Sequence, residues 1–206
     1  MMKLVVISNP EMVVDESIII NNLFKSGLKY FHIRKPNHNA TQVSKLIEEI
    51  HPQYYSYISL HQYHQLAKEF GIKRLHYTEQ ARTESDIQKW QAQIDAGYNL
   101  STSTHSLTSL SAFRLFDYVF YGPVFNSISK PGYQSIIPAD FKLDKDYPKP
   151  DVFALGGVDT SGLKKIKTMN FDGAAVLGAI WNEPDKAITN FKRLKENLPI
   201  YTQSND

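Results

Sequence analysis

The chain has 206 residues, 42% of them hydrophobic and 21% charged, and its 23 basic and 21 acidic side chains give a net charge of +2. This length and composition suit a single globular domain, residues 1–206, and the near-neutral charge favours neither nucleic acid nor an anionic membrane as a partner. The absence of cysteine excludes disulfides, thiolate metal ligands and cysteine nucleophiles, and the short apolar run after Lys3 is too brief for a signal peptide or membrane span, so we expect a cytoplasmic protein.

Strand-like and helix-like segments alternate along the whole chain. Runs of β-branched and aromatic residues predict strands at 3–8, 29–34, 54–60, 74–78, 98–103, 117–121, 151–155 and 173–177. Amphipathic runs predict helices at 15–27, 39–50, 64–71, 84–95, 106–115, 160–169 and 184–197. Eight such units predict an α/β fold, a closed eight-stranded parallel (β/α)8 TIM barrel. An open doubly wound sheet is the alternative, but SNPEM after the first strand has no glycine for a phosphate loop.

In a parallel barrel, functional residues lie where the strands end. The first five predicted strands end in polar residues: Ser8, Asn9, His32, Arg34, His61, Gln62, His76, Thr78, Ser103 and His105. The four histidines can supply acid–base groups, since histidine titrates near neutral pH. A zinc site built from three of them is conceivable, but their spacings of 29, 15 and 29 residues match no compact metal motif, so we predict no metal ligands.

The sixth predicted strand leads into an unusually long loop. The segment GPVFNSISKPG, residues 122–132, breaks the strand pattern, and no helix pattern begins before about Asp140. Loops of this length inside compact domains are usually functional or disordered. The hydroxyls of Ser127 and Ser129 beside Lys130 favour function, with the lysine acting as a mobile cation on a phosphate or a developing negative charge. A solvated lysine beside a serine-rich turn is the alternative.

Glycines at the last two strand ends predict a phosphate site. FALGGVD brings the seventh strand to Gly156 and Gly157, and DGAAVLGAIW brings the eighth to Leu177 and Gly178. Glycine lets the backbone approach an anion closely, and the loops after strands 7 and 8 of such barrels often bind phosphate through backbone N–H groups. A simple tight turn is the alternative for either glycine site taken alone.

The ordered segments FHIR, STSTHS, DYVFYGPVFNSISK, FALGGV and DGAAVLGAI resemble the thiamine phosphate synthase family, whose other branch is the TenI-like thiazole tautomerases. The resemblance covers nearly the whole chain. It implies a TIM barrel of thiamine biosynthesis that joins thiazole phosphate to hydroxymethylpyrimidine diphosphate and releases diphosphate. The implied catalytic residues are Lys130, Ser103 and Arg34. The implied substrate-binding residues are His32, His61, Ser127, Ile128, Ser129, Gly156, Gly157, Leu177 and Gly178.

The resemblance also implies Mg²⁺ at the diphosphate, held by aspartates and assisted by an arginine and a lysine. Arg34 matches its motif, but Pro36 stands at the lysine position, with Lys35 one residue earlier. Gln62 and Ala81 stand where the synthases have their two metal-binding aspartates. The thiazole-phosphate half of the site therefore matches the family, whereas the magnesium–diphosphate half does not.

Three functions remain open on this pattern. A transferase of the synthase type is favoured, because the loop motif with Pro123 and Lys130 is present. A thiazole phosphate isomerase is the second, although that branch has a histidine where this chain has Pro123. The third is a non-catalytic regulator that binds thiazole phosphate. The expected partners are these small molecules, with no nucleic acid and no membrane, and the sequence leaves a homo-oligomer open.

Overall fold

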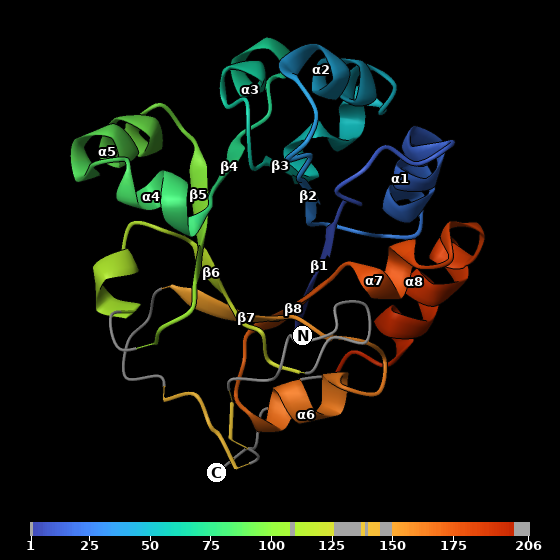
Figure 1. Cartoon of the computed structure of the whole chain (residues 1–206), viewed down its shortest axis with the longest axis vertical. Coiled ribbons are helices and arrows are strands. Elements are labelled where there is room, and N and C mark those ends of the chain that lie inside the picture. Colours follow the sequence, from blue (N-terminus) through green and yellow to red (C-terminus); the bar gives the residue numbers. More distant parts are fainter. Residues whose placement is uncertain (1, 108–109, 126–136, 139, 145–149, 200–206) are drawn as a thin grey trace.

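The barrel is closed and all its strands are parallel. The computed structural model describes residues 2–107, 110–125, 137–138, 140–144 and 150–199. Its eight strands pair in the order in which they follow in the chain, and the last pairs with the first, as Leu4 with Ala174. Helices surround this ring on the outside (Figure 1). The predicted (β/α)8 barrel is therefore confirmed.

The strands are short and the helices vary in length. The strands are β1 (Lys3–Ile7), β2 (Phe31–Ile33), β3 (Ile58–Leu60), β4 (Arg74–Tyr77), β5 (Asn99–Thr104), β6 (Tyr118–Tyr121), β7 (Asp151–Leu155) and β8 (Gly173–Val176). The α-helices are α1 (Glu16–Lys25), α2 (Ala40–Glu48), α3 (Gln65–Phe70), α4 (Glu79–Thr83), α5 (Ile87–Asp95), α6 (Leu163–Thr168), α7 (Gly178–Trp181) and α8 (Ala187–Glu196). The 3-10 helices are η1 (Pro52–Tyr57), η2 (Leu110–Phe113) and η3 (Pro184–Lys186).

The third predicted strand is wrong over most of its length. Only Ile58–Leu60 pairs as a strand, and the tyrosine-rich segment before it forms η1. Its rings pack on neighbouring helices instead of a sheet: the Tyr54 ring stacks on Phe24 with centroids 4.8 Å apart, and the Tyr55 hydroxyl donates to the carbonyl of Ile47 at 3.1 Å. Strand propensity mainly measures packing on a pleated surface, so these helix contacts override it.

Two further segments differ from the sequence prediction. The predicted helix 106–115 contains only the short 3-10 helix η2 among its described residues. Conversely, the structure contains a helix, α4, in a segment for which the sequence predicts none. The Thr78 hydroxyl accepts a hydrogen bond from the N–H of Ala81 at 3.2 Å and caps this helix, as threonine does at a helix N-terminus.

The inside of the barrel has an apolar half and a polar half. Successive strand residues face opposite sides, so every second residue points inward. The apolar half comes from β1 and β6–β8 and contains Val5, Ile7, Tyr118, Phe120, Phe153 and Ala175. The polar half comes from β2–β5 and contains the buried side chains His32, Ser59, His61, His76 and Ser101. TIM-barrel interiors are usually filled by valine, isoleucine and leucine, so this polar half needs a functional explanation.

Within the described residues, no helix combines the length and hydropathy that a bilayer crossing requires.

Candidate active site

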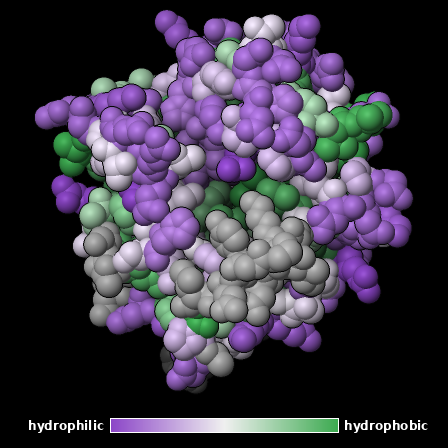
Figure 2. All heavy atoms as spheres, viewed as in Figure 1, coloured by the Kyte–Doolittle hydropathy of each residue, from purple (hydrophilic) through white to green (hydrophobic). Residues whose placement is uncertain are grey.

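The strand ends meet at one face of the barrel, which carries a central hollow with hydrophobic atoms at its floor (Figure 2). A hydrogen-bond pair joins the first two strand ends there. The Ser8 hydroxyl donates to the carbonyl of Arg34 at 3.1 Å and accepts from the Arg34 N–H at 2.9 Å. The backbone of Arg34, one of the predicted catalytic residues, is thereby fixed beside β1.

Three histidines from β2–β4 meet inside the polar half. His32 Nδ1 lies 2.9 Å from His61 Nε2, and His32 Nε2 lies 2.6 Å from the Tyr118 hydroxyl. His76 lies between two serines, with Nδ1 2.9 Å from Ser101 Oγ and Nε2 3.0 Å from Ser103 Oγ. The rings of His61 and His76 stack with centroids 3.9 Å apart. The structure therefore groups the predicted site residues His32, His61 and Ser103 with His76, a residue predicted as an acid–base candidate and considered for a zinc site.

Burial keeps this cluster uncharged. Desolvation is the main cause that lowers the pKa of His32 to about 3 and the pKa values of His61 and His76 well below their usual 6.5, with neighbouring positive charges adding to it. All three rings are therefore neutral at pH 7. The Nδ1 atom of His61 is buried and has no hydrogen-bond partner among the described residues.

Lys35, the residue beside the missing lysine position, is already engaged. Its ammonium is buried and donates to both carboxylate oxygens of Glu16, at 2.7 and 2.6 Å, and to the carbonyl of Glu11 at 2.7 Å. The side chains of Lys35 and Glu16 are 0% and 2% exposed. Lys35 therefore cannot also serve as a free cation for a diphosphate.

The residues at the two aspartate positions do not fit a protein-held Mg²⁺. The side-chain oxygen of Gln62 accepts a hydrogen bond from the backbone N–H of Lys35 at 3.2 Å, and Ala81 offers no side-chain ligand. The nearest carboxylate in sequence, Glu79, is paired with His105 at 2.8 Å and with Arg82 at 3.4 Å. Mg²⁺ requires several well-placed oxygen ligands, and these side chains do not supply them.

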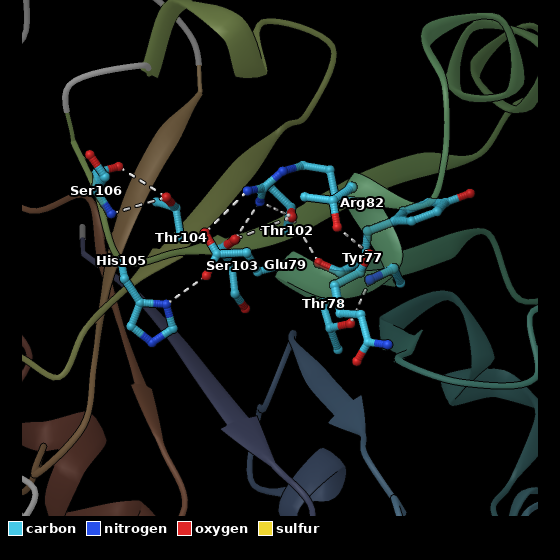
Figure 3. Close-up of polar contacts among 12 residues, drawn as sticks. Tyr77, Thr78, Glu79, Arg82, Thr102, Ser103, Thr104, His105 and Ser106 are labelled. Atoms are coloured by element: carbon cyan, nitrogen blue, oxygen red, sulfur yellow. Dashed lines mark hydrogen bonds and ion pairs between the residues drawn. The ribbon is translucent and has the colours of Figure 1, made fainter.

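Arg82 is a site residue that the sequence analysis missed. It extends from α4 across β5, where its guanidinium donates to the Thr102 hydroxyl at 2.8 Å and to the Ser103 carbonyl (Figure 3). The same view shows His105 beside Glu79 at the strand ends. Their side chains are 64% and 43% exposed, so this acid–base pair is open to solvent. Thr78 is a residue type that favours a helix N-terminus, so the sequence could have predicted that a helix follows it and that this helix carries Arg82.

The ends of β6 and β7 pack too closely for side chains at their glycines. A Cβ on Gly122 would lie 2.0 Å from the Leu155 carbonyl oxygen, and one on Gly156 would lie 2.8 Å from Pro123 Cα. Gly156 has a φ of 96° and Gly157 a φ of 63°, values that suit glycine. This packing leaves the Gly157 backbone exposed at the end of β7.

The β8 end completes the predicted phosphate region. Leu177 is the N-cap of α7, which begins at Gly178, and the first N–H groups of a helix have no acceptor within it. A groove of about 600 Å³ lies among the loop after β7 and helices α6, α7 and α8, and its lining includes Asp159, Lys164, Ala179 and Arg193 but not Gly157 or Gly178. The predicted residues Ser127, Ile128, Ser129 and Lys130 lie outside the described residues.

Comparisons with known proteins bear on the family and the fold. The family model described as thiamine monophosphate synthase matches residues 4–180. The solved thiamine phosphate pyrophosphorylase of Bacteroides thetaiotaomicron is 30% identical with a TM-score of 0.73, covering 95% of this chain and 97% of that one. That of Pyrococcus furiosus is 17% identical with a TM-score of 0.70, covering 95% of each chain, and shows the fold alone.

Two curated relatives match shorter stretches. A thiamine-phosphate synthase of Oceanobacillus iheyensis is 29% identical over 97 residues, 46% of this chain and 47% of that protein. One of Prochlorococcus marinus is 34% identical over 79 residues, 38% of this chain and 22% of that protein. The chain thus matches about half, or less, of the length of these curated relatives.

Proposed function

Because this chain belongs to the thiamine monophosphate synthase family, we propose that it couples thiazole phosphate to hydroxymethylpyrimidine diphosphate with release of diphosphate. The observation that carries this proposal is the glycine backbone at the ends of β7 and β8, where Gly157 and the start of α7 at Gly178 suit a phosphate group. Thiazole phosphate is the substrate whose phosphate would bind there.

Arg34 and Lys130 are the cations proposed to act on the leaving diphosphate. A departing diphosphate carries a large negative charge, which positive groups stabilise most in a site that excludes water. Lys35 is excluded from this role by its ion pair with Glu16. Since Gln62 and Ala81 do not supply metal ligands, this chain's own cations have to carry more of the charge than in a site with a protein-held Mg²⁺.

A thiazole phosphate isomerase is the second candidate, and the Glu79–His105 pair favours it. An isomerase moves a proton and needs no diphosphate site, so the substitutions at Gln62 and Ala81 would be neutral for it. It needs an accessible acid–base group, and His105 lies 2.8 Å from the Glu79 carboxylate at the open strand ends.

A pair of assays separates these functions. With both synthase substrates, the transferase releases diphosphate and forms thiamine phosphate, with and without added Mg²⁺. With the thiazole phosphate tautomer alone, the isomerase changes its NMR spectrum. If the protein binds thiazole phosphate in calorimetry but performs neither reaction, the transferase proposal is wrong and a binding protein remains.

A further inference from the structure

We propose that His32, His61 and His76 form a binding site inside the barrel for a divalent transition-metal ion of the Zn²⁺ class. This proposal concerns the polar half of the barrel interior, and it uses His32 and His61, which the family resemblance implies as substrate-binding residues. It does not require that the chain performs the transferase or the isomerase reaction. The three side chains come from adjacent strands, and one ring nitrogen of each lies within 4.8 Å of the other two. Such a grouping of three imidazoles is the donor set that zinc, copper and nickel prefer, whereas Mg²⁺ prefers oxygen.

One pair of nitrogens already lies close to the spacing that a bound ion requires. Zinc–nitrogen bonds of about 2.0–2.1 Å in a tetrahedral site place ligand nitrogens about 3.3 Å apart. His32 Nδ1 and His61 Nε2 are 2.9 Å apart and would separate slightly. The rings of His61 and His76 stack at 23° with centroids 3.9 Å apart, so the lone pairs of the two rings lie in nearly parallel planes and do not converge on one point. Binding through both therefore requires one ring to turn, so that metal bonds replace the stack.

Partners that orient metal-binding histidines are also present. A ligating histidine normally donates its second ring N–H to a neighbouring oxygen, which fixes the tautomer. If His32 binds the ion through Nδ1, its Nε2–H donates to Tyr118 at 2.6 Å. If His76 binds through Nε2, its Nδ1–H donates to Ser101 at 2.9 Å.

One feature of His61 is compatible with a bound ion. The side chain is 6% exposed, and its Nδ1 has no hydrogen-bond partner among the described residues. That nitrogen can therefore carry the ring N–H while Nε2 binds the ion, and no existing hydrogen bond of Nδ1 has to break.

The fourth ligand would be an anion. Three neutral imidazoles leave the charge of the ion uncompensated, and Arg34, which adds positive charge, directly follows β2, the strand that carries His32. Three protein ligands with one open position are typical of reactive zinc sites rather than of closed structural ones. Hydroxide or a phosphate oxygen entering from the strand-end hollow would fill that position.

The test measures metal stoichiometry on the full chain. The protein is treated with EDTA, dialysed and titrated with ZnCl₂ in a calorimeter and with CoCl₂ in a spectrophotometer. We expect a single ion per chain and the visible absorption of four-coordinate Co²⁺. His32→Gln, His61→Gln and His76→Gln should each weaken binding by about 100-fold or more, since loss of an outer partner alone costs about 10–100-fold. Tyr118→Phe, which removes such a partner, should weaken it by about 10-fold.

His105→Gln is the matched control, because His105 is exposed and beside a carboxylate but outside the cluster. It should leave the affinity unchanged. If a cluster variant does not fold, the ring-nitrogen NMR signals of the wild-type protein provide the second measurement, since Zn²⁺ should shift those of three buried histidines. Absence of stoichiometric binding, or binding lost in His105→Gln and kept in the cluster variants, would overturn the proposal. Failure of the diphosphate assay would not affect it.

Discussion

Breaking the buried Lys35–Glu16 pair should destabilise the protein far more than breaking an ion pair at its surface. Removing one partner leaves the other as an unpaired buried charge, which costs about 3–5 kcal/mol. Both side chains are almost fully buried, at 0% and 2% exposure. We therefore expect Glu16→Gln and Lys35→Met each to lower the free energy of unfolding by this amount. The melting temperature should fall by about 6–20 °C, at about 2–4 °C per kcal/mol for a domain of this size.

The two variants should respond to pH in opposite directions. Burial raises the pKa of Glu16 and lowers the pKa of Lys35. In Lys35→Met the lone Glu16 carboxyl has a raised pKa, so the folded state binds more protons than the unfolded state, and stability increases as pH falls from 7 towards 5. In Glu16→Gln the lone Lys35 has a lowered pKa, so the unfolded state binds more protons, and stability increases as pH rises above 7.

Urea denaturation at pH 5, 7 and 9 measures both effects. Glu183→Gln is the matched control, because it breaks the Lys186–Glu183 pair, which is 57% and 55% exposed, and exposed pairs contribute at most about 1 kcal/mol. The double variant Glu16→Leu/Lys35→Met should recover most of the loss, since it leaves no buried charge. The reasoning is refuted if Glu16→Gln is as stable as Glu183→Gln at pH 7, or if both single variants follow pH in the same direction.

Three further predictions concern the strand-end site. Synthase activity, if measurable, should persist with chelator, and Gln62→Asp with Ala81→Asp should raise it in the presence of Mg²⁺; wild-type activity abolished by EDTA would contradict this. Lys130→Ala should weaken thiazole phosphate binding, measured by calorimetry, on the order of 10²-fold, and it should weaken binding more than Arg34→Ala does. If Arg34→Ala has the larger effect, we have assigned phosphate binding to the wrong strand ends. Gly122→Ala should lower the unfolding free energy by about 1–3 kcal/mol through overpacking, because its Cβ would lie 2.0 Å from a backbone oxygen of β7; an unchanged urea midpoint would show that the β6 and β7 ends can separate.

The barrel itself could be predicted from the sequence because each strand carries a local signal. The runs at β1, β6, β7 and β8 are apolar, buried on both faces and bounded by polar residues or glycine, as parallel strands are. The position of Gly156 and Gly157 at the end of β7 could be predicted for the same reason, since two glycines directly after a strand form a local pattern. The tyrosines of η1 carry a strand signal too, but the stacking of Tyr54 on Phe24 joins residues that are far apart in the sequence, so no local window contains it.

The interior of the site could not be predicted in this way. His32, His61 and His76 are far apart in the chain, and the pairing of β2 with β3 and of β3 with β4 places their nitrogens within 4.8 Å. The sequence spacing argued against a metal site because compact motifs hold their ligands on one short element. The ion pair between Lys35 and Glu16 could not be predicted either. Glu16 is the first residue of α1, and a carboxylate at the start of a helix is usually exposed, so nothing in the local sequence indicates its burial.

The two halves of the barrel interior should also differ in the free energy that local opening of their strands requires. The polar half includes β2 and β3, which have three residues each, whereas β1 and β7 of the apolar half have five. A strand that is held by few ladder hydrogen bonds opens locally at a lower free energy than a longer strand. Backbone amides of β2 and β3 should therefore exchange with solvent deuterium before those of β1 and β7, so the same strands that bring the histidines together form the side through which an ion can enter.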